Sequence, residues 1–186
     1  MTSLARDALN GVESGLVVPV PIATPVVSPW RERLDPSAVH GVPAHVTVLY
    51  PFLPPPDLSH EVIVRLARLF ASREAFRFSL ESVGWFGDEV VYLAPSPPES
   101  FIELTLAVMD DFPGYAPYAG TFDEIVPHLT VGDRGDVAEL RQAADSVAAH
   151  LPIAARATEV WMMVGAAARG RWTVHSRFPL GGRAAD

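Results

Sequence analysis

The stretch "VPAHVTVLYPFLPPP", residues 42–56, decides how the rest of the chain is interpreted. Its apolar and β-branched residues predict a strand that ends at Pro51. Side chains alternate across a strand, so His45 and Thr47 lie next to each other on the face opposite Val46 and Val48. A histidine bonded to a neighbouring threonine is also an ordinary core feature, and one such pair therefore does not establish a site.

The same pattern returns 83 residues later. "PHLTVG" repeats "AHVTVL", with His128 and Thr130 again interleaved with apolar residues. A helical pattern and two strand patterns follow each motif, so the chain contains a β-α-β-β unit twice. A duplicated fold with a pseudo-twofold axis brings the two motif strands together. We therefore expect both His-Thr pairs to point into one cleft.

Hydrophobic periodicity and proline positions predict the remaining elements. We expect strands at 15–23, 45–50, 76–86, 88–95, 151–164 and 171–181, and helices at 57–74, 97–114 and from 136 onward. The prolines in 15–23 predict a strand at a sheet edge. The stretch 31–41 is expected to be a loop with some helical turn.

The composition predicts a folded, globular protein. Of 186 residues, 49% are apolar and 19% are charged. The net charge of −8 argues against an extended nucleic-acid surface, and all 14 basic residues are arginines, which suit a small phosphate-bearing ligand. There is no cysteine, no signal-peptide pattern and no apolar run of membrane-spanning length. We expect a soluble, cytoplasmic monomer that does not bind membranes.

Two histidines that face one phosphate from opposite sides supply a general base and a general acid. The threonine hydroxyls can donate hydrogen bonds to the non-bridging oxygens. A strained cyclic phosphodiester needs no metal for this chemistry. Because the sequence also lacks an HExxH-like motif and the histidines neighbour threonines instead of carboxylates, we expect neither a metal nor another cofactor.

The paired motifs resemble the 2H phosphoesterase superfamily, in particular its 2′-5′ RNA ligase-like and cyclic phosphodiesterase branch. The resemblance is carried by "GVPAHVTVLYPFLPP", "YAPYAGTFDEIVPHLTVG" and "RGRWTVHSRFPLG", and it extends from about residue 15 to 182. It implies an α+β, bilobal fold of two duplicated lobes with mainly antiparallel sheets around a central cleft. We expect one bilobal domain over 1–186, with lobes at approximately 15–96 and 97–182.

The resemblance also implies an activity, namely metal-independent opening of the 2′,3′-cyclic phosphate of a nucleotide or an RNA 3′ end. The catalytic residues of the 2H family correspond to His45, Thr47, His128 and Thr130 in this chain. The resemblance implies that His128 is the base toward water and that His45 is the acid. One alternative is a 2′-5′ RNA ligase, which the acidic, lysine-free chain disfavours. The other is a non-catalytic nucleotide- or RNA-binding module, which does not need two intact His-Thr pairs.

Further contacts to the substrate are expected from two other regions. Arg134 follows the second motif and is a candidate for the phosphate, and Tyr92 is a candidate for stacking on a base. The alternation of β side chains also places Leu49 and Gly132 on the cleft face, two positions beyond each threonine. Gly132 has no side chain, which leaves room for a substrate to approach.

In "RWTVHSRF" the same alternation separates two faces. Phe178 belongs to the set expected under the helices, whereas Thr173, His175 and Arg177 share the other face. If that face lines the cleft, these three side chains contact the substrate. They fit a solvated sheet edge equally well.

Overall fold

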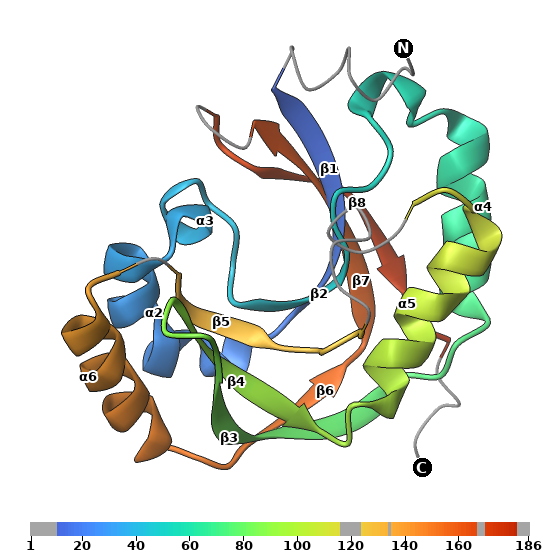
Figure 1. Cartoon of the computed structure of the whole chain (residues 1–186). Helices are drawn as coiled ribbons and strands as arrows, with labels where there is room; N and C mark the ends of the chain where they lie inside the picture. The colour runs from blue at the N-terminus through green and yellow to red at the C-terminus, as the bar shows by residue number, and fades with distance from the viewer. Residues whose placement is uncertain (1–10, 116–123, 134, 167–169, 182–186) are drawn as a thin grey trace.

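Two antiparallel sheets organise the part of the chain that this computed structural model describes, residues 11–115, 124–133, 135–166 and 170–181 (Figure 1). The first sheet has the strand order β2-β1-β7-β8, and the second has the order β5-β4-β3-β6. The strands are β1 (Val12–Pro19), β2 (His45–Leu49), β3 (Phe76–Phe86), β4 (Val90–Ser96), β5 (Leu129–Asp133), β6 (Ile153–Ala157), β7 (Glu159–Ala166) and β8 (Thr173–Pro179). The predicted bilobal α+β fold with antiparallel sheets is confirmed.

Helices cover one face of each sheet. They are α2 (Thr24–Leu34), α3 (Pro36–Val39), α4 (His60–Ala71), α5 (Glu99–Asp111) and α6 (Val137–Ala148), with short 3₁₀ turns at Pro21–Ala23 and Pro55–Asp57. Helices α4 and α5 pack on the first sheet, and α2 and α6 pack on the second (Figure 1). No helix in the described ranges is long and apolar enough to span a membrane.

The sheets do not follow the expected division of the chain near residue 96. Each sheet takes two strands from the first half of the sequence and two from the second. The two motif strands, β2 and β5, are each the edge strand of their own sheet, and they lie in contact with each other. This arrangement brings the two halves of the duplication together at one place.

Three predicted elements differ from the structure. Strand β1 is an interior strand, not an edge, because Pro19 is its last residue and leaves the ladder intact. The predicted loop at 31–41 overlaps α2, a helix with Pro25 near its start, where a missing N–H costs nothing. The predicted strand 151–164 is two strands in different sheets, β6 and β7, separated at Thr158.

An extra residue interrupts each motif strand directly after its threonine. In β2, Thr47 pairs with Val17 but Leu49 pairs with Leu16, so Val48 is a bulge. In β5, Thr130 and Gly132 likewise pair with adjacent residues of β4, so the bulge is Val131. A bulge adds one residue to one strand and changes which face the following side chains occupy.

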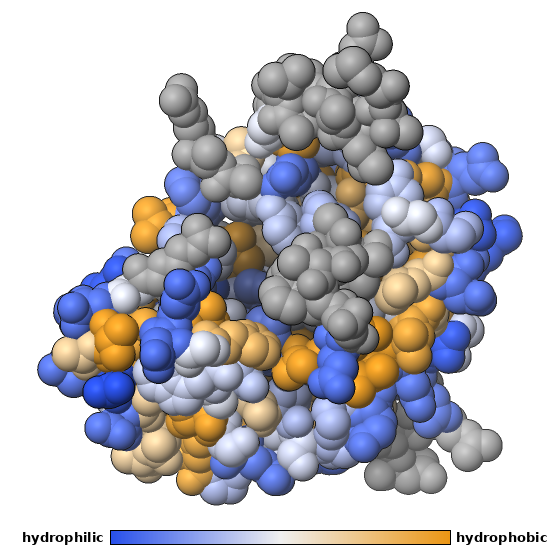
Figure 2. Space-filling model, viewed as in Figure 1, coloured by the Kyte–Doolittle hydropathy of each residue, from blue (hydrophilic) through white to orange (hydrophobic). Residues whose placement is uncertain are grey.

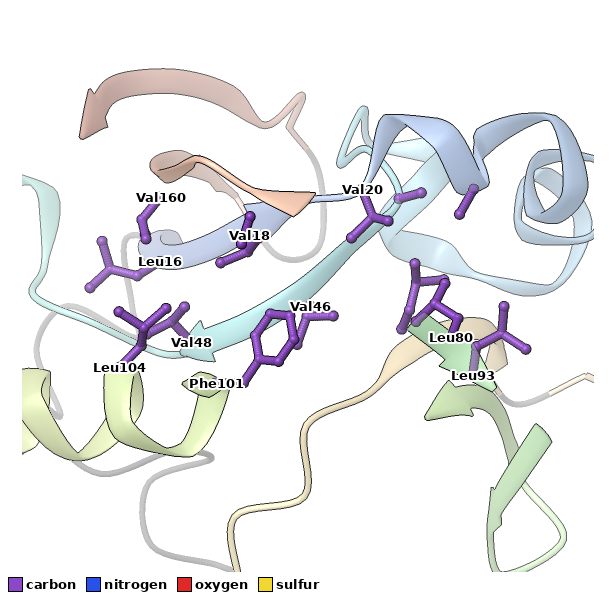
Figure 3. Close-up of a cluster of buried hydrophobic side chains, with 14 of the residues drawn as sticks. Leu16, Val18, Val20, Val46, Val48, Leu80, Leu93, Phe101, Leu104 and Val160 are labelled. Carbon is purple, nitrogen blue, oxygen red and sulfur yellow. The ribbon is translucent and has the colours of Figure 1, made fainter. Parts of the chain in front are cut away.

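The apolar face of β2 forms part of the core. Val46 and Val48 are buried and lie against Phe101 and Leu104 of α5 (Figure 3). The buried hydroxyl of Thr105, one residue further along α5, donates a hydrogen bond of 2.8 Å to the carbonyl oxygen of Val48. Helix α5 therefore binds the first bulge by a polar contact as well as by packing.

We predict that Thr105→Val destabilises the protein. The substitution preserves the shape of the side chain but removes the donor to the Val48 carbonyl, and a buried carbonyl without a partner costs about 1–3 kcal/mol. The free energy of unfolding, measured by urea denaturation, should fall by that amount. Thr105→Ser keeps the hydroxyl and is the control. A Thr105→Val variant as stable as the wild-type protein would show that this hydrogen bond does not contribute to stability.

Candidate active site

The two His-Thr pairs lie on facing edge strands. His45 and Thr47 are half-buried on β2, and Thr130 is half-buried on β5, with His128 directly before that strand. The residues between them, Val46 and Leu129, are fully buried on the opposite face. Near the middle of the view, where these strands lie, the molecular surface is hollowed (Figure 2). We call the side that carries the two pairs the cleft face.

Each histidine is anchored in the same way. Nδ1 of His45 lies 2.7 Å from the carbonyl oxygen of Pro43, and Nδ1 of His128 lies 2.7 Å from that of Val126. A carbonyl oxygen only accepts hydrogen bonds, so Nδ1 must donate in both rings. In the neutral state this fixes the proton on Nδ1 and leaves Nε2 as the basic nitrogen. Both imidazoles therefore present the same nitrogen for proton transfer.

The electrostatic surroundings of His45 favour its neutral form. Burial and the guanidinium of Arg31 lower the pKa of His45 to about 4, and the charge of His128 acts in the same direction. The Pro43 carbonyl and the carboxylate of Asp35 act in the opposite direction. Arg31 is itself 3% exposed, forms a 2.8 Å ion pair with Asp35, and donates to the carbonyl of Val42. The effect of His128 on His45 also indicates that the two rings lie within electrostatic range.

Aromatic rings surround His128. The ring of Phe86 meets the imidazole edge-on at a centroid distance of 4.9 Å, and the ring of Tyr92 lies 5.4 Å from it. Phe86 and Tyr92 are stacked on each other at 4.4 Å. Burial lowers the pKa of His128, and the hydrogen bond to Val126 partly opposes this. Tyr92, predicted as a stacking residue, thus lies at the site.

The two bulges correct one prediction about the cleft face. Leu49 and Gly132 were expected beside the catalytic pairs, but each follows a bulge and turns to the other face. Leu49 is fully buried, and a Cβ on Gly132 would lie only 2.7 Å from the side chain of Leu140 in α6. Gly132 therefore leaves room for a helix, not for a substrate.

A third bulge divides the predicted set on β8. Arg177 pairs with Trp161 of β7, but beyond the bulge at His175 the register changes, and Thr173 pairs with Val164. Thr173 therefore occupies the face opposite Arg177, and the expectation of one shared face is wrong. The exposed His175 contacts the hydroxyl of Ser176 at 2.9 Å. Phe178 is buried as predicted.

Arg134, the remaining predicted contact, lies outside the described residues. Three side chains near the site were not identified from the sequence: Arg31, Asp35 and Phe86. The spacing of Arg31 and Asp35 is that of an i,i+4 helical ion pair, but the stretch was interpreted as a loop. Phe86 reaches His128 through the pairing of β3 with β4 and of β4 with β5, which the sequence pattern does not reveal.

Within the described ranges, no cluster of three or more histidines and carboxylates could hold a metal ion. A separate surface groove lies between α4 and α5, with Arg65, Arg68 and Asp110 among its lining residues. These helices cover the outer side of the first sheet, so the groove is not part of the cleft face.

Comparisons with known proteins identify relatives with this fold. The structure resembles the crystal structure of E. coli LigT complexed with 3′-AMP, with a TM-score of 0.56 and 22% identity over 90% of this chain and 97% of that chain. A crystal structure of a phosphoesterase gives a TM-score of 0.56 and 23% identity, covering 90% and 98%. TT0787 of Thermus thermophilus gives 0.59 and 19%, covering 92% and 99%. A comparison with curated protein sequences gives no match.

At these identities the structures establish a shared fold only. The sequence itself matches the family model of the 2′-5′ RNA ligase superfamily over residues 18–169, which is most of the chain. The resemblance to 2H phosphoesterases stated from the motifs is thereby confirmed. This protein belongs to the 2′-5′ RNA ligase superfamily.

Proposed function

We propose that this protein is a metal-independent phosphoesterase that hydrolyses a 2′,3′-cyclic phosphodiester on a nucleotide or an RNA 3′ end. The observation that carries the proposal is the matched anchoring of His45 and His128, which directs the same ring nitrogen of each toward proton transfer. Pure binding of a nucleotide does not need two histidines in one defined tautomer. A general acid and a general base do need a defined tautomer, because each must present one particular ring nitrogen to the reacting atoms.

In the proposed reaction, Nε2 of one neutral histidine removes a proton from water. The resulting hydroxide forms a bond to phosphorus, opposite the ribose oxygen that leaves. Nε2 of the other histidine, protonated before the reaction, transfers its proton to that oxygen. The P–O bond of the ring breaks and the product is a phosphomonoester, for which the resemblance to 2H enzymes favours the 2′ position. The hydroxyls of Thr47 and Thr130 donate to the non-bridging oxygens.

Small anionic nucleotides fit this proposal. Solved structures of E. coli LigT contain 3′-AMP, phosphate, ATP or NADP⁺, so a related fold binds phosphate-bearing ligands of this size. For the present chain, the described residues offer imidazoles and hydroxyls at the site in place of a carboxylate cluster. The negative charge that develops on phosphorus would then be stabilised by imidazolium and hydroxyl donors.

We predict a large difference between histidine and threonine variants. His45→Ala or His128→Ala removes a proton-transfer group and should lower kcat by about 10²–10⁴-fold on a 2′,3′-cyclic nucleotide. Thr47→Val or Thr130→Val removes one neutral hydrogen bond and should cost roughly tenfold. Far-UV circular dichroism checks that each variant is folded. Histidine variants that retain most of their activity would refute the mechanism.

A second prediction concerns metal ions. Hydrolysis of the same substrate should be unchanged in excess EDTA, and added Mg²⁺ or Mn²⁺ should not increase it. The control is a metal-dependent phosphodiesterase assayed in the same buffers, which EDTA must inactivate. Loss of activity on chelation, restored by a divalent cation, would contradict the proposed chemistry.

The third prediction concerns pH. One histidine must be protonated and the other neutral, so kcat/KM should follow a bell-shaped profile whose limbs are the two macroscopic pKa values of the pair. Below the lower pKa no base is present, and above the upper pKa no acid remains. Since the pKa of His45 is lowered to about 4 and that of His128 is also lowered from 6.5, the maximum should lie below pH 6.5. A rate that rises to an alkaline plateau would exclude this pair.

A further inference from the structure

A continuous row of side chains crosses the first sheet from the candidate active site. Thr47 of β2 pairs directly with Val17 of β1, Val17 pairs with Trp161 of β7, and Trp161 pairs with Arg177 of β8. Directly paired residues of antiparallel strands project from the same face. Trp161 and Arg177 therefore share the cleft face with Thr47.

The far end of this row carries a positive charge on an aromatic ring. The guanidinium carbon of Arg177 lies 4.5 Å from the centre of the Trp161 ring, within the range of a cation–π contact. Arg177 is exposed, and it forms no ion pair with a carboxylate among the described residues. The stacking holds the planar guanidinium in place while its N–H donors remain available for an anion.

The indole of Trp161 adds a second observation. Its Nε1 is buried and has no hydrogen-bond partner in the described part of the chain. Buried donors in proteins are nearly always paired, and an exception is often explained by a ligand or an ordered water that supplies the acceptor. The row thus combines the available guanidinium of Arg177 with the unpaired Nε1–H donor of Trp161.

The second sheet has a different arrangement at the corresponding positions. There the residue paired with Thr130 is Tyr92, whose ring lies across Gly84 of β3 and against His128. In the first sheet the residue next to the threonine is the smaller Val17, and the aromatic ring belongs to the following strand. The two sheets are therefore unequal, and among the described residues only the first presents a cation in this row.

The separation along the row defines what Arg177 can reach. Neighbouring strands lie about 4.8 Å apart, and Trp161 and Arg177 are two and three strands from Thr47, so the guanidinium on the Trp161 ring lies about 10–14 Å from Thr47. That distance is too long for contact with a phosphate held between the histidines. We infer that Arg177, stacked on Trp161, binds a second phosphate of the substrate and selects cyclic phosphates that carry a further phosphate group. The inference rests on the proposed function of the His-Thr site.

Binding of reaction products tests the inference without requiring turnover. Calorimetry would compare a nucleoside 2′-monophosphate with two ligands that carry further phosphates: a dinucleotide ending in a 2′-phosphate, and an ADP-ribose phosphate. The dinucleotide adds a phosphodiester and the ADP-ribose phosphate adds a diphosphate. Comparing the two therefore shows which of these groups Arg177 binds. The wild-type protein should bind at least one of them roughly tenfold or more tightly than the monophosphate, as expected for a charge-assisted contact.

Arg177→Gln should abolish this preference while leaving affinity for the monophosphate within about twofold, and Arg177→Lys should restore part of it. Arg68→Gln removes the same charge from an exposed position on α4, which packs on the opposite face of the first sheet, and should have no effect. The inference is wrong if Arg177→Gln still prefers the ligands with a further phosphate, or if it loses affinity equally for all three ligands. Either result leaves the proposed function of the His-Thr site intact. If none of the phosphates binds to the wild-type protein, the proposed function fails together with it.

Discussion

The single extra residue after each motif threonine is the constraint on which the site depends. Without a bulge, a strand that carries His and Thr on the cleft face would continue to place every second residue there. The bulges at Val48 and Val131 end this alternation, so that Leu49 and Gly132 join the core beneath the helices. Each motif strand can thus present two polar side chains and still be held by packing immediately afterwards.

The duplication supplies a symmetric framework, but the two histidines occupy unequal environments. Both donate from Nδ1 to the carbonyl two residues earlier, which gives them the same tautomer. His45 then lies near the buried ion pair of Arg31 and Asp35, whereas His128 lies against Phe86 and Tyr92. Burial lowers the pKa of both imidazoles, and the guanidinium of Arg31 lowers that of His45 in addition. Surroundings that push the pKa values of two like groups apart suit the separate roles of a general acid and a general base.

The features that the sequence predicted are those set by local periodicity. Alternation placed His45 and Thr47 on one face, and the 3.6-residue period located α4, α5 and α6. The predictions that failed depend on register between strands distant in sequence. A bulge leaves no mark in the pattern of apolar residues, so Thr173 was assigned to the wrong face. For the same reason the sequence does not show that Trp161 shares a sheet face with Thr47, since the two residues are related only through the pairings of β2 with β1 and of β1 with β7.

Net charge and local charge lead to different conclusions about ligands. The chain is acidic overall, which argues against a long nucleic-acid footprint. Several arginines are neutralised within the protein, in the pairs Arg31–Asp35, Arg33–Glu139 and Arg65–Asp111. Arg177 differs, because its described partner is an aromatic ring that orients the guanidinium without neutralising it. A positive charge of this kind, on the same sheet face as Thr47 in an acidic protein, favours a short anionic ligand that enters the cleft over an extended nucleic-acid strand that lies across the surface.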